Sequence, residues 1–216
     1  MKFQNIILRI THYLCAMTFS VRQLLYFYII LTVLFIIGLI WGFETLTIKI
    51  LSLNHPNLDT LMSVVTQWAE WPVIVIAIGL SVYCLGRIGW IWGLAFLIEG
   101  TIVNVAKATI NWPRPAIRFP HLVRQIDGNT LSQWKAFPSG HTTAAFFGTA
   151  IILSLWRNEW PQFLKLLLTL MAFAVAYSRV YLGQHSFEDV LAGAWLGLGL
   201  FWAFYRFFHH KNWITS

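Results

Sequence analysis

The sequence predicts an all-α fold, a six-transmembrane helical bundle that forms a single domain over residues 1–216. The composition is the first observation: 58% of the residues are hydrophobic and 11% are charged, whereas a soluble domain has about 25% charged residues. The second observation is that the apolar residues gather in six runs of helical length, separated by polar segments. An uncharged run of about 20 residues is long enough to cross a bilayer as a helix.

Residues 1–22 are predicted to form an amphipathic helix that lies on the membrane interface. The helical spacing of its apolar residues indicates this, because Lys2, Arg9 and His12 fall off the apolar stripe. A leader to the first span is the alternative. The segment does not resemble a secretory signal, because no short apolar core is followed by a small-residue cleavage site.

Six spans are expected, at about residues 24–43, 60–85, 88–106, 141–156, 163–177 and 187–207. The second run is interrupted by Glu70 and Pro72, and the proline predicts a kink or a restart of the helix. The third run contains Glu99, and a carboxylate inside a span is costly. We expect Glu99 either to support a cationic site near Lys107 or to make a structural hydrogen bond in the bundle.

Two polar stretches connect the early spans. Residues 44–59 are predicted to be a turn-rich link, because they contain Asn54-His55-Pro56-Asn57. Residues 107–137 form a long hydrophilic connection, which is expected to be a lid or substrate-recognition loop. Within it, Arg118, His121 and Arg124 either contact a second phosphate or headgroup, or lie solvated on the surface.

The centre of the functional pattern is Pro138-Ser139-Gly140-His141, where a polar loop meets an apolar run. Serine can cap a helix N-terminus, and glycine lets an anion approach the backbone. The free amides of such an N-terminus bind anions.

Further charged residues stand at the ends of the neighbouring runs. Lys107 and Arg114 follow the third run, Arg179 and His185 lie between the fifth and sixth runs, and Asp189 stands at the start of the sixth. Phosphoryl transfer spreads negative charge over oxygens that must be neutralised by Mg²⁺ or by Lys and Arg. Surplus cations with two histidines and no metal-binding spacing therefore favour phosphoryl transfer without a metal.

In order, Lys107-x6-Arg114-Pro115, Pro138-Ser-Gly-His141 and Ser178-Arg179-x5-His185-x3-Asp189 resemble the three-part signature of the type 2 phosphatidic acid phosphatase superfamily. That superfamily also holds glucose-6-phosphatase and the vanadium haloperoxidases. Many members carry a proline where this chain has Phe187, a departure expected to alter the entry of the last helix and to leave the chemistry alone.

The resemblance implies a role for each matching residue. His185 would be the nucleophile and form a phosphohistidine, Asp189 would orient its ring, and His141 would act as general acid and then as general base. The phosphate would be held by cations and by the helix start, namely by Lys107, Arg114, Ser139, Gly140 and Arg179. This scheme requires no metal and no cofactor.

The resemblance also implies the substrate class, a lipid phosphate such as phosphatidic acid, phosphatidylglycerol phosphate, undecaprenyl diphosphate or a lipid A phosphate. A lipid-to-lipid phosphotransferase is the alternative within the enzyme class. A non-catalytic lipid-phosphate binder or transporter is the alternative outside it, and the retained His141, His185 and Asp189 disfavour it.

The net charge of +7 is interpreted as attraction to anionic lipids and an anionic substrate, not to nucleic acid. Of the 15 Lys and Arg residues, the larger share falls in the terminal segments and the even-numbered loops. The excess of Lys and Arg in these segments grows when the motif cations Lys107, Arg114 and Arg179 are left out of the count. The positive-inside rule then predicts cytoplasmic termini and an active site on the opposite face, periplasmic or extracellular. The protein is expected in the bacterial cytoplasmic (inner) membrane.

Overall fold

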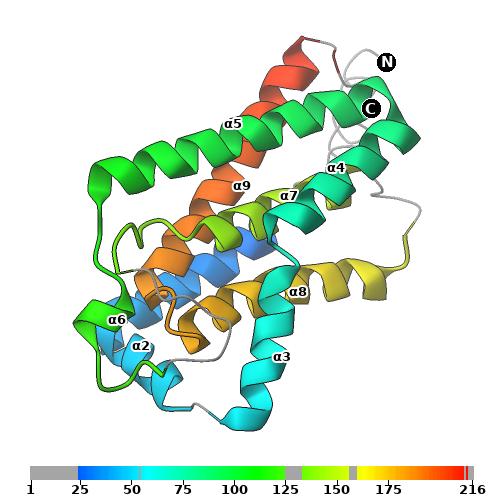
Figure 1. Cartoon of the computed structure of the whole chain (residues 1–216). Helices are drawn as coiled ribbons and strands as arrows, with labels where there is room; N and C mark the ends of the chain where they lie inside the picture. The colour runs from blue at the N-terminus through cyan, green and yellow to red at the C-terminus, as the bar shows by residue number, and fades with distance from the viewer. Residues whose placement is uncertain (1–23, 54, 125–132, 156–159, 212, 214–216) are drawn as a thin grey trace, which may run out of the picture.

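Every regular element in the part of the chain that the structure describes is a helix (Figure 1). The computed structural model describes residues 24–53, 55–124, 133–155, 160–211 and 213. The all-α prediction is confirmed. The predicted interfacial helix at residues 1–22 lies outside the described residues.

The helices follow one another along the chain as Leu24–Trp41, α2 (Phe43–Ser52), α3 (Pro56–Gln67), α4 (Trp71–Leu85), α5 (Arg87–Ile110), α6 (Pro115–Arg118), α7 (Gly140–Leu155), α8 (Gln162–Tyr181) and α9 (Phe187–His210).

Five helical stretches among the described residues have the length and apolar composition of a membrane span: Leu24–Trp41, Pro56–Leu85, Arg87–Arg118, Gln162–Tyr181 and Phe187–His210. The predicted span at 141–156 corresponds to α7, an apolar helix of 16 residues. At about 1.5 Å per residue, α7 is roughly 24 Å long, shorter than the hydrocarbon core of about 30 Å.

The predicted link at residues 44–59 is wrong in part, because it contains α2 and the beginning of α3. Gly42 has a φ of 84° and separates the first helix from α2. The second apolar run is divided into α3 and α4, as Pro72 predicted, and the proline lies in the first turn of α4.

The predicted loop at residues 107–137 also differs from the structure at its beginning. Helix α5 continues past the expected end at residue 106 and ends at Ile110, where Asn111 adopts a left-handed cap. Helix α6 follows shortly after. Residues 125–132 of the expected lid lie outside the described residues, so the lid stays a prediction.

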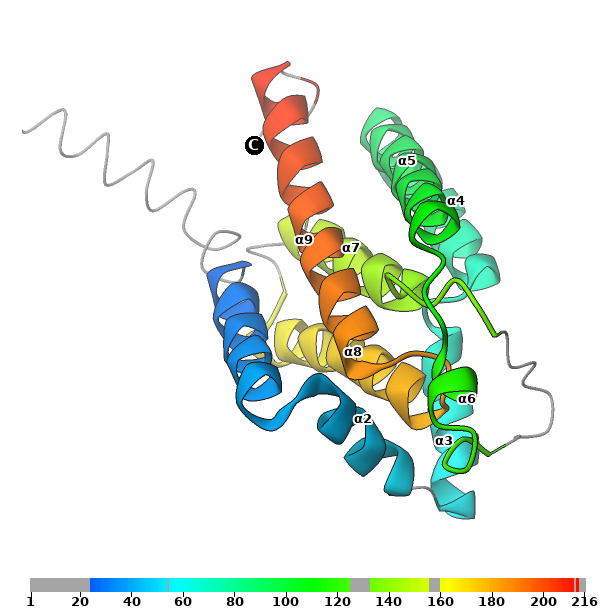
Figure 2. The same ribbon diagram turned by 90° about the vertical axis from the view of Figure 1, so that its left-hand side faces the viewer.

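Helices α7 and α9 pack with their backbones close together, and this contact forms the centre of the bundle (Figure 1, Figure 2). A Cβ atom at Gly193 would lie 2.6 Å from the carbonyl oxygen of Ser139. A Cβ atom at Gly197 would lie 2.5 Å from the carbonyl oxygen of Thr143. The two glycines therefore bring the start of α9 against the start of α7, where the sequence motifs lie.

Helices α4 and α5 form a hairpin along one side of the molecule (Figure 2). Helix α5 also contacts α7 and α9, and its buried positions, including Trp92 and Val103, follow helical spacing along one face. Helix α4 is strongly apolar and has no buried residue. We infer that α4 presents its surface to lipid.

Replacing Gly197 by alanine should destabilise the protein, because the added methyl group collides with the α7 backbone. We expect a loss of about 1–3 kcal/mol, as for other overpacked sites. Gly199 is the matched control, since a Cβ atom there meets nothing within 4 Å. Gly199→Ala should be neutral or stabilise the helix by about 0.5–1 kcal/mol. Tryptophan fluorescence during unfolding in detergent measures the stability of both variants. Equal losses of stability in the two variants would contradict the close packing at Gly197.

Candidate active site

His185 is held in the short loop between α8 and α9, and its side chain is 1% exposed. The backbone amides of Gln184 and His185 both donate to the carbonyl oxygen of Arg179 at 3.1 Å. Gly183 makes the reversal possible, because its φ of 68° lies in the region that glycine adopts without strain. The chain thus folds back on the end of α8 and fixes the position of His185.

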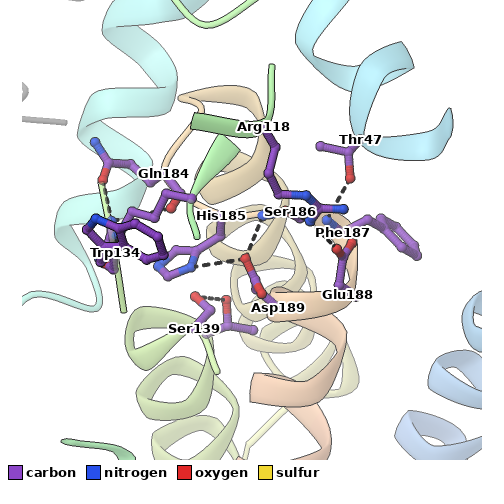
Figure 3. A network of polar contacts seen from close by, with 12 residues as sticks. Thr47, Arg118, Trp134, Ser139, Gln184, His185, Ser186, Phe187, Glu188 and Asp189 are labelled. Carbon is purple, nitrogen blue, oxygen red and sulfur yellow. Dashed lines mark hydrogen bonds and ion pairs between the residues drawn. The ribbon is translucent and has the colours of Figure 1, made fainter. Parts of the chain in front are cut away.

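Asp189 lies in the first turn of α9 and is fully buried, at 0% exposure. Its Oδ2 atom accepts a hydrogen bond from the Ser186 amide at 2.8 Å and lies 3.7 Å from Nδ1 of His185 (Figure 3). Ser186 and Asp189 together form a capping box, which satisfies the free amides of the helix start. The cap therefore fixes the carboxylate beside the imidazole.

The motif at residues 138–141 is fixed to the same turn of α9. The Ser139 amide donates to the Asp189 carbonyl oxygen at 3.0 Å. The Ser139 hydroxyl accepts a hydrogen bond from Thr142 Oγ1 at 2.9 Å, and the Ser139 carbonyl accepts one from Thr143 Oγ1 at 2.8 Å. The start of α7 thus has a defined position relative to His185 and Asp189.

Arg179 and Arg114 are the guanidinium groups at two of the predicted phosphate-binding positions. Arg179, in the last turn of α8 and 7% exposed, donates through Nη1 to Thr66 Oγ1 of α3 at 2.9 Å. Its Nε atom is buried and has no hydrogen-bond partner among the described residues. Arg114 donates through Nη1 to Gln184 Oε1 at 2.8 Å, next to His185 in the chain. An unpaired buried donor at Arg179 is suited to an anionic ligand.

Lys107 reaches the start of α7 from the last turn of α5. A Cβ atom placed on Gly140 would lie 3.4 Å from the Nζ atom of Lys107. A side chain at position 140 would therefore occupy the space beside the ammonium group. Glycine leaves that space free for an anion that contacts both the cation and the helix start.

The site is electrically positive around His185. Burial lowers the pKa of His185 well below its usual value, and the nearby charges of Arg179, Arg114 and Lys107 lower the pKa further. The imidazole is therefore neutral at neutral pH. A neutral ring has a free lone pair, which a nucleophile requires.

His141 lies in the first turn of α7, and its Nε2 atom is buried without a hydrogen-bond partner among the described residues. The positive charges of Arg179, Lys107 and Arg114 act electrostatically on the His141 ring. His141 in turn acts electrostatically on His185. The structure thus brings the two predicted catalytic histidines and the three predicted phosphate-binding cations together at one end of the bundle. Glu99 is buried in α5, at 4% exposure, two turns before Lys107, and its role stays a prediction.

Arg118 is paired with protein carboxylates, and this contact was missed at the level of the sequence. It donates to Ser186 Oγ at 2.9 Å and to Glu188 (Figure 3). It also donates to Glu44 of α2 at 2.7 Å. Thr47 of α2 also accepts a hydrogen bond from the Phe187 amide at 3.0 Å. These contacts hold the start of α9 against α2 and α6, which is a structural use of Arg118.

Arg124 is likewise paired with a carboxylate, that of Asp59, at 2.8 Å. Asp59 also accepts a hydrogen bond from the Tyr181 hydroxyl at 2.9 Å. His121 is exposed. The possible headgroup contacts of Arg118 and Arg124 are therefore replaced in this structure by ion pairs that join the loop to α2, α3 and α9.

Comparisons with known proteins show the family of this chain. The PAP2 superfamily model matches residues 88–213. The undecaprenyl-diphosphatase BcrC of Bacillus subtilis (strain 168) is 29% identical over 163 residues, which are 72% of this chain and 78% of that protein.

Two solved structures share the fold. A transmembrane PAP2-type phosphatidylglycerolphosphate phosphatase from Bacillus subtilis has a TM-score of 0.65 and 25% identity, covering 90% of this chain and 98% of that one. LpxE from Aquifex aeolicus has a TM-score of 0.62 and 25% identity, covering 76% of this chain and 94% of that one.

The chain belongs to the PAP2 superfamily, within its membrane lipid phosphatases. The apolar helices and the bacterial relatives indicate a bacterial membrane protein.

Lowering the pH should destabilise the protein through His185. The unfolded chain binds a proton at His185 with a pKa near 6.5, whereas the folded pKa is lower. Below about pH 6.5 the unfolded state therefore binds more protons, and the free energy of unfolding falls by up to about 1.4 kcal/mol per pH unit. His185→Gln should lose less stability than the wild type between about pH 7 and about pH 5. Denaturant unfolding in detergent tests this, and identical pH dependence would contradict a neutral His185.

Proposed function

We propose that this protein removes phosphate from a lipid phosphomonoester or diphosphate through a covalent phosphohistidine at His185. The observation that supports the proposal most directly is the buried, neutral imidazole of His185, placed between a carboxylate and three cations. A nucleophile needs the neutral ring, and a phosphoryl group needs the cations.

In the first step, Nε2 of His185 attacks phosphorus, and the bond from phosphorus to the lipid oxygen breaks. Asp189 is 3.7 Å from Nδ1 and closes to hydrogen-bonding distance when the ring becomes charged. Catalytic hydrogen bonds are often long in the absence of substrate and shorten in the complex. The carboxylate then stabilises the positive ring, as it does in a catalytic triad.

His141 moves the protons of both steps. It gives a proton to the leaving lipid oxygen in the first step and becomes neutral. In the second step it takes a proton from water as that water attacks the phosphohistidine. The P–N bond breaks, phosphate leaves, and His141 is again protonated for the next cycle.

Lys107, Arg114 and Arg179 neutralise the oxygens of the transferring group, and Ser139 and the Gly140 amide complete the cradle. The unpaired Nε of Arg179 and the open space at Gly140 support this assignment. No group of three or more His, Cys, Asp or Glu side chains among the described residues could hold a metal ion. The scheme therefore assigns charge neutralisation to the three cations.

The substrate is a membrane lipid whose headgroup enters the site while its hydrocarbon chains stay in the bilayer. The relatives named undecaprenyl-diphosphatase and phosphatidylglycerolphosphate phosphatase support testing undecaprenyl diphosphate and phosphatidylglycerol phosphate first. Phosphatidic acid and lipid A phosphates share the same reacting group. Glu99 is assigned a supporting role beneath Lys107.

The protein is proposed to cross the inner membrane six times, with α7 as a short sixth span. An even number of crossings places both termini on one side, and the distribution of Lys and Arg assigns that side to the cytoplasm. The site then faces the periplasm.

The purified protein in detergent micelles should release inorganic phosphate from at least one lipid of this panel. His185→Ala should reduce the rate by at least about a thousandfold, because no other group replaces the nucleophile. His210→Ala, at the opposite end of α9, is the matched control and should keep the wild-type rate. A near-normal rate in His185→Ala would refute the nucleophile. Transfer of phosphate to a second lipid in place of release would identify a phosphotransferase, and binding without release would identify a carrier.

Activity should persist after prolonged treatment with EDTA, because Lys107, Arg114 and Arg179 supply the charge that Mg²⁺ supplies in other phosphoryl transfers. Phosphate release is measured before and after the chelator, and again after Mg²⁺ is added back. A loss of activity that added Mg²⁺ restores would overturn the metal-free scheme.

A further inference from the structure

The break in the second apolar run places a carboxylate beside His141. Helix α3 ends at Gln67 and α4 begins at Trp71, so Glu70 lies in the break as the N-cap of α4, with extended backbone angles of φ −84° and ψ 153°. Helix α3 packs on α8, and Thr66, one turn before Glu70, accepts the hydrogen bond from Arg179. The break is therefore fixed at the level of the site.

The Oε1 atom of Glu70 lies 4.0 Å from Nε2 of His141. That nitrogen is buried and has no hydrogen-bond partner among the described residues. The Glu70 side chain is 44% exposed, so it has room to rotate toward the ring. A buried nitrogen without a partner facing a carboxylate that can move is an incomplete hydrogen bond.

The positive charge around His141 explains why a carboxylate near this ring would be useful. Arg179, Lys107 and Arg114 all act on the His141 ring, so a protonated His141 adds a positive charge to a positive site. A nearby carboxylate compensates that charge. The Asp189 carboxylate lies 3.7 Å from the His185 ring. The Glu70 carboxylate lies 4.0 Å from the His141 ring in the same way.

We propose that Glu70 is a positioning residue for His141, so that the site contains two histidine–carboxylate pairs. Glu70 accepts a hydrogen bond from the ring nitrogen that faces it and leaves the other ring nitrogen for the leaving lipid oxygen. In the first step that second nitrogen gives its proton to the alkoxide, and in the second step it takes a proton from water. Glu70 itself exchanges no proton with the substrate or water in either step.

This inference rests on the proposed function, because His141 needs an orienting carboxylate only if it is the general acid and base. It also assigns a role to the interruption at Glu70 and Pro72, which the rest of the mechanism does not use. A continuous helix through residues 68–70 would carry this side chain in a different direction.

The test compares two leaving groups in Glu70→Gln. An alkyl lipid phosphate needs a proton from His141 to leave, whereas p-nitrophenyl phosphate leaves as a stable anion without one. Since kcat/KM reports the first step, we expect it to fall about 10- to 100-fold for the lipid, as for other residues that orient a catalytic group. For p-nitrophenyl phosphate we expect a change of less than about threefold. Glu70→Asp should recover part of the lipid activity.

Glu44→Gln is the matched control, since it makes the same chemical change at an exposed carboxylate of α2 that faces Arg118 and not His141. It should keep the wild-type ratio of the two kcat/KM values. Thermal unfolding of each variant separates misfolding from a change in chemistry. An unchanged ratio in a folded Glu70→Gln protein would overturn this inference alone. A wild-type protein that releases no phosphate from any lipid would overturn the proposed function, and this inference with it.

Discussion

The structure depends on the position of Asp189, because this one residue contacts the start of α7, the start of α9 and His185. Its backbone carbonyl accepts the amide of Ser139, which fixes the start of α7. Its side chain accepts the amide of Ser186, which caps α9, and the same carboxylate oxygen faces His185. The cap that begins α9 therefore also places the carboxylate beside the His185 ring. Glycines 193 and 197 make this arrangement possible, because larger residues would hold α9 away from α7.

Much of the site was predictable from the sequence, because its residues stand at the ends of apolar runs. Helix ends in a membrane bundle lie near the bilayer surface, so Lys107, Arg179 and His185 were expected to meet. The serine and glycine at 139 and 140 indicated a helix start that binds anions, and α7 begins at Gly140. The proline at 72 predicted the break between α3 and α4, although it did not predict what the break would face.

The remaining features were not predictable, because they depend on contacts between distant parts of the chain. Arg118 resembled a free cation in a polar loop, and its partners Glu44 and Glu188 are far from it in sequence. Helix α2 was hidden because residues 43–52 are too short and mixed in composition to stand out as a span, although Glu44 in its first turn and Lys49 in its last favour a helix. Glu70 appeared only as an interruption of an apolar run, and only the packing of α3 on α8 brings it near His141.

The placement of Lys107 on the α4–α5 hairpin links the site to the physical state of the bilayer. Arg179, His185 and Asp189 lie on α8, α9 and the loop between them. Lys107 lies in the last turn of α5, whose hairpin partner α4 has no buried residue. Lipid molecules therefore surround most of this hairpin, and a change in bilayer thickness alters the tilt of such helices. A change in tilt moves the ammonium group of Lys107 relative to Gly140. We therefore expect turnover to depend on the acyl-chain length of the surrounding lipids, including lipids that never enter the site.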